Sequence, residues 1–152
     1  MKIKCPECVL LGGLLVILLA VVAVFSLLPA QQGIVDYGGF VAHLKKLNVT
    51  VVEGGLAEKD DMLRGEKHKL YINDEYVQVW EYRSENSALR DKENIGPDGS
   101  EIKMGFGSVA IVDWVAPPHF YQKGRIIVLY NGENKEILTA LEAVLGQQFA
   151  GS

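Results

Sequence analysis

The sequence contains only two cysteines, Cys5 and Cys8, and both lie near its start. Because no cysteine follows them, disulfides cannot hold the rest of the chain together, and its fold must depend on a hydrophobic core. The chain also has no excess of basic residues: it carries 15 lysines and arginines but 19 acidic residues, and its isoelectric point is about 5.4. We therefore exclude nucleic acid as the main partner, because phosphate binding needs clustered positive charge.

Residue arrangements typical of catalysis are absent as well. The three histidines are isolated from one another in the sequence: His43, His68 and His119. Gly105-Phe106-Gly107-Ser108 precedes a predicted strand, whereas a nucleophile elbow leads into a helix. The sequence thus favours a non-catalytic module. The alternative is a hydrolase or metal-dependent enzyme whose site assembles from distant residues such as Asp98, Asp113 and His119.

One long apolar run accounts for the positive mean hydropathy of +0.13. From Val9 to Leu28 the chain has 20 residues, of which 17 are apolar and none is charged. A helix of this length spans about 30 Å, the thickness of the hydrocarbon core of a bilayer. The rest of the chain is too short to enclose such a helix. We therefore predict one transmembrane helix, through which the protein binds the membrane.

An uncleaved signal-anchor is favoured over a cleaved signal peptide. The run is longer than the usual apolar region of a signal peptide. In addition, Leu28, which precedes Pro29-Ala30, is not the small residue that a cleavage site requires. If the leader were cleaved, the protein would instead be secreted.

The charges before the apolar run predict its orientation. This segment carries two lysines and one glutamate: Lys2, Lys4 and Glu7. The positive-inside rule places residues 1–8 in the cytoplasm and the C-terminal part outside. We expect residues 29–35 to form a linker and residues 36–152 to form an extracytoplasmic domain. Residues 29–152 carry 13 basic and 18 acidic side chains, a net charge of −5.

The spacing of Cys5 and Cys8 is that of a zinc-binding or redox pair. A structural zinc ion takes four ligands, so these two cysteines would complete a site only across a dimer. We favour the alternative, in which the two thiols lie beside the membrane and stay reduced or become acylated. No cofactor is therefore expected, and zinc is the one to test by metal analysis of the full-length protein.

The C-terminal part alternates helical and strand patterns. Helices are predicted over residues 36–47, 84–93 and 134–145, with Asp36 and Ser84 as N-caps and Gly146 as a C-cap. Strands are predicted over residues 49–53, 69–72, 76–82, 108–114 and 125–130. This order indicates a two-layer α+β domain, with a mostly antiparallel sheet of 4–5 strands and 2–3 helices, preceded by one transmembrane helix.

One aromatic segment is the candidate binding site. It contains two prolines in a predicted loop between two core strands, with four rigid side chains close by: Trp114, Pro117, Pro118, His119, Phe120 and Tyr121. Rigid aromatic side chains lose little entropy on binding, which suits an interaction surface. The alternative, which we favour, is that Trp114 and Phe120 fill the end of the core while the prolines make the turn.

The same segment carries a resemblance to a known group of proteins. With Tyr76–Tyr82, Pro97–Ser100 and the ending Leu145–Gly151, it resembles small uncharacterised exported bacterial proteins. These have a similar Trp…Pro-Pro-His-Phe-Tyr…Ile-Val-Leu-Tyr run after a signal or lipoprotein leader. The resemblance covers residues 36–151 and implies an extracytoplasmic location and no known activity. The leader differs, because its cysteines precede the apolar run and no lipobox is present.

Together these features predict a single-pass protein of the cell membrane with an outer α+β domain. We expect that domain to bind an unknown protein or cell-surface ligand without catalysis. The alternative within the same topology is an accessory subunit of a membrane complex. The oligomeric state does not follow from the sequence.

Overall fold

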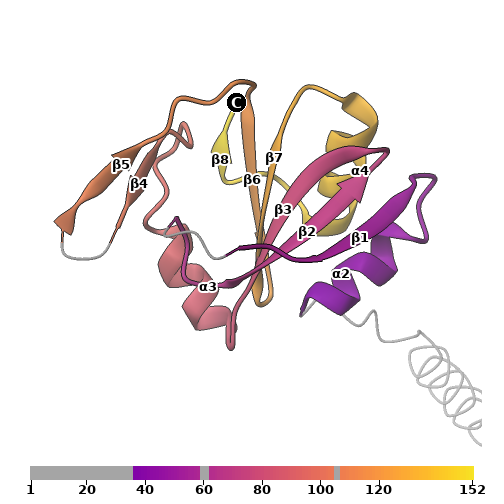
Figure 1. Ribbon diagram of the computed structural model, residues 1–152, viewed down its shortest axis with the longest axis horizontal. Coiled ribbons are helices and arrows are strands. Elements are labelled where there is room, and N and C mark those ends of the chain that lie inside the picture. Colours follow the sequence, from indigo (N-terminus) through magenta and orange to yellow (C-terminus); the bar gives the residue numbers. More distant parts are fainter. Residues whose placement is uncertain (1–35, 59–61, 105–106) are drawn as a thin grey trace, which may run out of the picture. The chain divides into compact units, whose positions relative to one another are not determined.

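The computed structural model describes residues 36–58, 62–104 and 107–152 (Figure 1). Its main sheet has six strands in the order β1-β2-β3-β7-β6-β8, and every neighbouring pair is antiparallel. The strands are β1 (Val51–Leu56), β2 (Glu66–Ile72), β3 (Glu75–Glu81), β6 (Pro118–Lys123), β7 (Ile126–Asn131) and β8 (Ala150–Gly151). The described helices are α2 (Tyr37–Leu44), α3 (Glu85–Lys92) and α4 (Lys135–Leu145). The predicted α+β class with a mostly antiparallel sheet is confirmed, with six strands instead of four or five.

Each described helix begins at a polar cap. Asp36 accepts a hydrogen bond from the Gly39 backbone N–H at 2.9 Å, and Ser84 and Asn134 cap α3 and α4 in the same way. A side-chain oxygen at this position satisfies a backbone N–H that has no partner within the helix. The predicted helix starts are therefore confirmed to within a residue.

The β2–β3 hairpin is fixed by its two-residue turn. Asn73 and Asp74 have φ angles of 49° and 65°, the conformation that a type I′ turn demands at both central positions. The turn sets the register, in which Lys69 lies opposite Gln78. Because side chains alternate along a strand, Val79 and Trp80 lie on opposite faces of the sheet.

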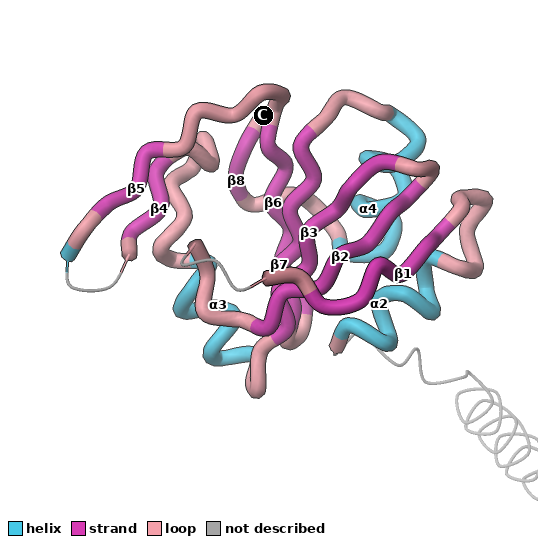
Figure 2. The backbone as a smooth tube through the Cα atoms, in the orientation of Figure 1, coloured by secondary structure: helices cyan, strands magenta, loops and turns pink. Residues whose placement is uncertain are grey.

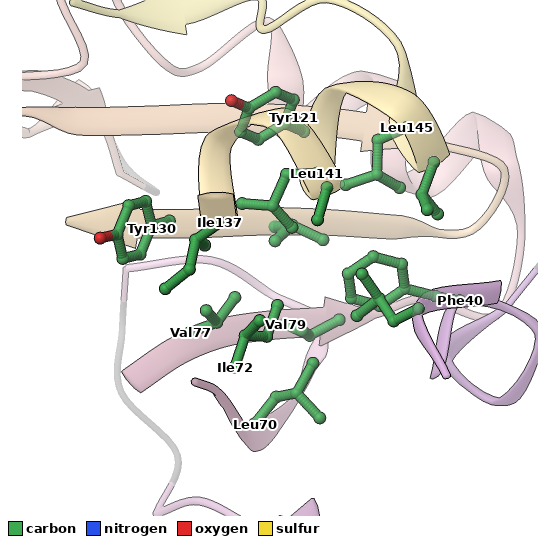
Figure 3. Close-up of a cluster of buried hydrophobic side chains, with 14 of the residues drawn as sticks. Phe40, Leu70, Ile72, Val77, Val79, Tyr121, Tyr130, Ile137, Leu141 and Leu145 are labelled. Carbon is green, nitrogen blue, oxygen red and sulfur yellow. The ribbon is translucent and has the colours of Figure 1, made fainter. Parts of the chain in front are cut away.

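Helices α2 and α4 cover one face of the sheet (Figure 3). Ile137, Leu141 and Leu145 of α4 project towards the strands and belong to one cluster with fully buried residues such as Val79 of β3 and Phe40 of α2. The contribution of each such side chain is about 1.5–3 kcal/mol of transfer free energy. This face holds the larger of the two cores.

The opposite face holds a second core around α3. Trp80, Phe120 and Ile127 are fully buried there, and α3 packs on β6 and β7. Helices therefore lie on both faces of the sheet, in contrast to the two layers that we predicted. The physical reason is that β3, β6 and β7 carry large apolar side chains on both faces, and each face needs a cover.

Strands β1 and β2 are longer than predicted, and the two largest differences lie elsewhere. Residues 118–123, expected in a loop, form strand β6 between β7 and β8. Pro118 is tolerated because it is the first residue of that strand, where a missing N–H costs least. The strand expected over residues 108–114 is only β5 (Val109–Ile111), which pairs with β4 (Glu101–Lys103) in a separate hairpin beside the main sheet (Figure 1).

The predicted transmembrane helix over Val9–Leu28 lies outside the described residues, and so do the linker and the cysteine pair. Within residues 36–58, 62–104 and 107–152, no helix is long and apolar enough to cross a membrane. The transmembrane helix therefore stays a prediction from the sequence.

Tyr130 gives the fold a testable response to alkaline pH. It is fully buried, its hydroxyl donates a hydrogen bond to Glu75, and burial followed by this contact raises its pKa from 10.0 to about 12. A raised tyrosine pKa contributes stability that is complete below pH 10 and is lost as the pH rises through 12.

We expect Tyr130→Phe to lower the free energy of unfolding at pH 7 by about 1–2 kcal/mol, because Glu75 and the Asn134 N–H lose a partner. Between pH 10 and 12 the same variant should lose stability less steeply than wild type, because one group fewer is forced to ionise. Urea unfolding at pH 7, 10 and 11 measures both effects. An unchanged alkaline slope would contradict the role of Tyr130.

Candidate functional site

A large hollow lies where the open end of the β2–β3 hairpin meets α3, and its volume is about 930 Å³. Its basic lining residues are Arg64, Lys67, Arg83, Arg90 and Arg125. The whole sequence contains four arginines, and all four are in this set. Two lining residues are acidic, Glu66 and Glu81. Positive charge therefore gathers at one place in a chain that is acidic as a whole.

The buried carboxylate of Asp91 holds the Arg64 side chain on one wall of the hollow. Asp91 of α3 is 2% exposed and accepts hydrogen bonds from the Arg64 N–H at 2.8 Å and the Arg64 Nε at 2.6 Å. The Tyr82 hydroxyl also donates to Asp91, at 2.9 Å. Asp91 holds the pKa of Arg64 above its ordinary value. Burial is the main cause that raises the pKa of Tyr82, and the charge of Asp91 is the second cause. The guanidinium stays charged at a fixed position, and the Arg64 side chain is 71% exposed.

Arg125 is fixed by two carboxylates on the opposite wall. Its Nη2 lies 3.1 Å from Glu81 Oε1 and 3.4 Å from Asp36 Oδ2, and its side chain keeps 32% of its surface exposed. Glu81 Oε2 lies 3.5 Å from Nε2 of His68, whose ring stacks on Tyr37 at 4.0 Å. This cluster ties the start of α2 to the sheet and leaves one edge of the guanidinium for a ligand.

Arg83 and Arg90 are the exposed cations of the hollow. Arg83 follows the last residue of β3, and Arg90 lies on α3, where its Nη2 donates to the Ser87 hydroxyl at 3.3 Å. Among residues 36–58, 62–104 and 107–152, neither one forms an ion pair with a carboxylate. Planar guanidinium groups bind carboxylates and phosphates through two parallel hydrogen bonds. These two side chains are therefore the strongest anion-binding groups of the hollow.

The lining of the hollow suits the binding of anions, because five of its residues are basic. The described residues that line it include no histidine, aspartate or cysteine. The Ser87 hydroxyl lies 2.9 Å from the Ser84 hydroxyl and accepts from Arg90, so no base stands beside it. An activated nucleophile needs such a base or a lowered pKa. The basic residues of the hollow therefore offer several cationic groups to one anion.

Comparison of the chain with known protein families, with curated proteins and with solved structures found no match. The resemblance to small exported bacterial proteins therefore stays a prediction. The candidate site is defined by the residues and geometry of the hollow alone.

The structure divides the aromatic segment that we predicted as a binding surface between two faces of the sheet. Phe120, fully buried, packs edge-on against the half-buried Trp114 in the core beside α3. His119 and Tyr121 point to the face covered by α4 and are 7% and 3% exposed. The hydrogen bond from Trp114 Nε1 to the Gly99 carbonyl, at 3.0 Å, holds the 96–99 turn over the second core. The two prolines are half-buried (Pro117) and buried (Pro118).

A substitution at His119 tests whether the aromatic segment belongs to the core or forms a binding surface. Its ring nitrogens lie 2.7 Å from Gln148 Oε1 and 3.1 Å from the Gly132 carbonyl oxygen. We expect His119→Ala to lower the free energy of unfolding by about 2 kcal/mol, because two half-buried partners are left without a hydrogen bond. Urea unfolding measures this. An unchanged stability with loss of partner capture would instead support the binding hypothesis.

The residues proposed for a distributed metal or hydrolase site do not form a metal cluster. Among residues 36–58, 62–104 and 107–152, no group of three histidine, cysteine, aspartate or glutamate side chains is arranged to hold a metal ion. His119 contacts Gln148 and Gly132, and Asp98 accepts hydrogen bonds from Ser100, which lower its pKa. Asp98 and His119 thus bond to other groups, and Asp113 is exposed. Cys5 and Cys8 lie outside the described residues.

Our sequence reasoning missed the four arginines because they are far apart in the chain. One signal was available for two of them. A two-residue turn at Asn73-Asp74 sets a hairpin register that, continued past Glu66 and Glu81, brings Arg64 opposite Arg83. The positions of Arg90 and Arg125 depend on how α3 and the β6–β7 turn pack against that hairpin, and no spacing rule predicts this.

Proposed function

We propose that this protein is a membrane-anchored, extracytoplasmic binding module that holds an anionic ligand in the arginine-lined hollow, without catalysis. The single observation that carries the proposal is that all four arginines of the chain line one hollow. Residues 29–152 otherwise have a net charge of −5. If the four arginines were placed at random on an acidic surface, they would lie far from one another. Their convergence is the feature that a binding role explains.

The way the arginines are held supports the same proposal. Asp91 and Glu81 orient Arg64 and Arg125 from behind, while Arg83 and Arg90 present their guanidinium groups without a carboxylate partner among the described residues. A cation that is oriented before binding loses less side-chain entropy when the ligand arrives. Carboxylate and phosphate groups are the anions that a guanidinium fits best. The membrane anchor and the outer location come from the sequence prediction.

The volume of the hollow favours a ligand larger than a simple ion. At about 930 Å³ it lies at the upper end of the range for small-molecule sites, which is about 300–1,000 Å³. A single inorganic phosphate would contact only part of the lining. We therefore expect affinity to rise with the number of negative groups that one ligand carries.

The test uses the full-length protein in detergent micelles and isothermal titration calorimetry. The probes are hexagalacturonate, which carries six carboxylates, and maltohexaose, a neutral oligosaccharide of the same length. We expect hexagalacturonate to bind, with an affinity that falls as salt is added, because screening weakens exposed charge pairs. Equal binding of the two sugars, or binding of neither, would contradict the proposal.

A further inference from the structure

An open face of the sheet adjoins the hollow. It is formed by the side chains that β1, β2 and β3 direct away from α2 and α4: Val52, Lys67, Lys69, Tyr71, Tyr76 and Gln78. Figure 2 shows these three strands side by side. Helix α3 packs on β6 and β7, and on this face Val52 and Tyr76 are 51% and 40% exposed. We call this surface the open face.

The open face adjoins the hollow along strand β2. Lys67 lines the hollow, and Lys69 and Tyr71 follow it at every second position of β2, so all three lie in one row. That row is about 13 Å long between Lys67 and Tyr71, at about 3.3 Å per residue. A ligand that leaves the hollow along β2 therefore meets a second cation and then an aromatic ring.

The charge of the open face matches that of the hollow. Its six residues include two lysines and no carboxylate. The acidic residues of the same strands point to the other face, where Glu53 pairs with Lys45 of α2 and Glu81 pairs with Arg125. An anionic chain on the open face would thus meet attraction at Lys67 and Lys69 and no opposing carboxylate from these strands.

The end of the row is a pair of tyrosines. Tyr71 and Tyr76 lie opposite each other in the β2–β3 register, with ring centroids 5.6 Å apart and an angle of 41° between the ring planes. An exposed tyrosine offers an apolar ring face together with a hydroxyl that forms hydrogen bonds. A sugar ring presents the complementary surfaces, because its C–H groups form an apolar face and its hydroxyls lie at the edge. Gln78 adds an amide that hydrogen-bonds to hydroxyls.

We propose that the ligand of this protein is an acidic carbohydrate chain, with the acidic groups of one end in the hollow and the sugar rings that follow across the open face on Tyr71 and Tyr76. This inference rests on the proposed function and names its ligand class. A single-stranded nucleic acid also combines rings with charge. Sugar rings carry hydroxyls around their edge, which suit the amide of Gln78 and the tyrosine hydroxyls, so we favour the carbohydrate and treat nucleic acid as an outcome of the test.

The experiment compares probes of different length and chemistry on the full-length protein in detergent micelles. The probes are digalacturonate, hexagalacturonate, a polyphosphate of similar charge and hexathymidylate. We expect hexagalacturonate to bind at least about tenfold more tightly than either the dimer or polyphosphate, because only the long sugar reaches the tyrosines with its rings. Equal or tighter binding of hexathymidylate or polyphosphate would overturn the assignment to carbohydrate.

Two variants locate the effect on the open face. Tyr76→Ser should weaken hexagalacturonate binding about tenfold and leave digalacturonate binding unchanged. Lys69→Gln, which removes a charge but no core contact, should weaken the hexamer several-fold and likewise spare the dimer. Thermal melts check that both variants fold. If the folded variants bind the hexamer as wild type does, the open-face proposal fails while the proposed function stands. If wild type binds no galacturonate at all, the proposed function itself fails.

Discussion

Replacing Arg83 and Arg90 together by glutamate is expected to weaken the binding of hexagalacturonate by about 100-fold. Both side chains are exposed in the hollow and neither pairs with a carboxylate among the described residues, so the substitutions break no ion pair there. One exposed charge pair contributes about 0.2–1 kcal/mol, and each reversal also adds repulsion of similar size. Two reversals therefore change the binding free energy by about 2–3 kcal/mol, which is a factor of roughly 30–150.

A matched control separates this local effect from a change in net charge. Lys46 and Lys103 are exposed and do not line the hollow, so Lys46→Glu with Lys103→Glu produces the same net charge. We expect that control to weaken binding less than about threefold through long-range charge alone. Titration calorimetry of both double variants at one salt concentration makes the comparison. Equal losses in the two would show that binding depends on overall charge and not on the hollow.

Asp91→Ala is expected to lower the free energy of unfolding by about 3 kcal/mol. Asp91 is 2% exposed and accepts hydrogen bonds from the backbone N–H and Nε of Arg64 and from the Tyr82 hydroxyl. Each buried donor left without an acceptor costs about 1–3 kcal/mol, whereas the exposed Arg64 guanidinium regains water and adds little. Urea unfolding at pH 7 measures the loss.

The same substitution tests whether fold and site are linked. Because Asp91 orients Arg64, we expect Asp91→Ala to weaken hexagalacturonate binding several-fold under conditions where the variant remains folded. Asp113→Ala removes an exposed aspartate and serves as the control, with an expected change within about 0.5 kcal/mol. A loss of less than 1 kcal/mol for Asp91→Ala would show that its buried hydrogen bonds are not structural.

The elements that local chemistry determines were predicted well. The predicted caps Asp36 and Ser84 each place a side-chain oxygen at a helix start, and this depends only on neighbouring residues. The Asn73-Asp74 turn likewise fixes its hairpin locally. The segment at Pro118 was not predicted, because local rules read two prolines as a loop. Strand β6 forms there since β7 and β8 pair with it on either side, which is tertiary information.

The candidate site was less predictable than the fold. The aromatic segment was the candidate binding site because rigid rings suit a binding surface. They suit a core equally well, and composition alone does not separate the two uses. The structure buries Phe120, as the favoured core alternative predicted, and it also buries Tyr121, which follows from the pairing of β6 and not from the sequence pattern. The arginines carried no motif, and their convergence depends on the packing of α3 against the β2–β3 hairpin. Functional clusters of this kind emerge only at the level of tertiary structure.

The most direct test of a ligand in the hollow uses the side chains of the arginines themselves. The chain has only four, so NMR spectra of the full-length protein in micelles contain four Nε–H signals to follow during titration. We predict that hexagalacturonate shifts the signals of Arg83 and Arg90 most, those of Arg64 and Arg125 less, and the indole signal of Trp114 not at all. Four unmoved arginine signals, with shifts at Trp114 and its neighbours, would contradict the account.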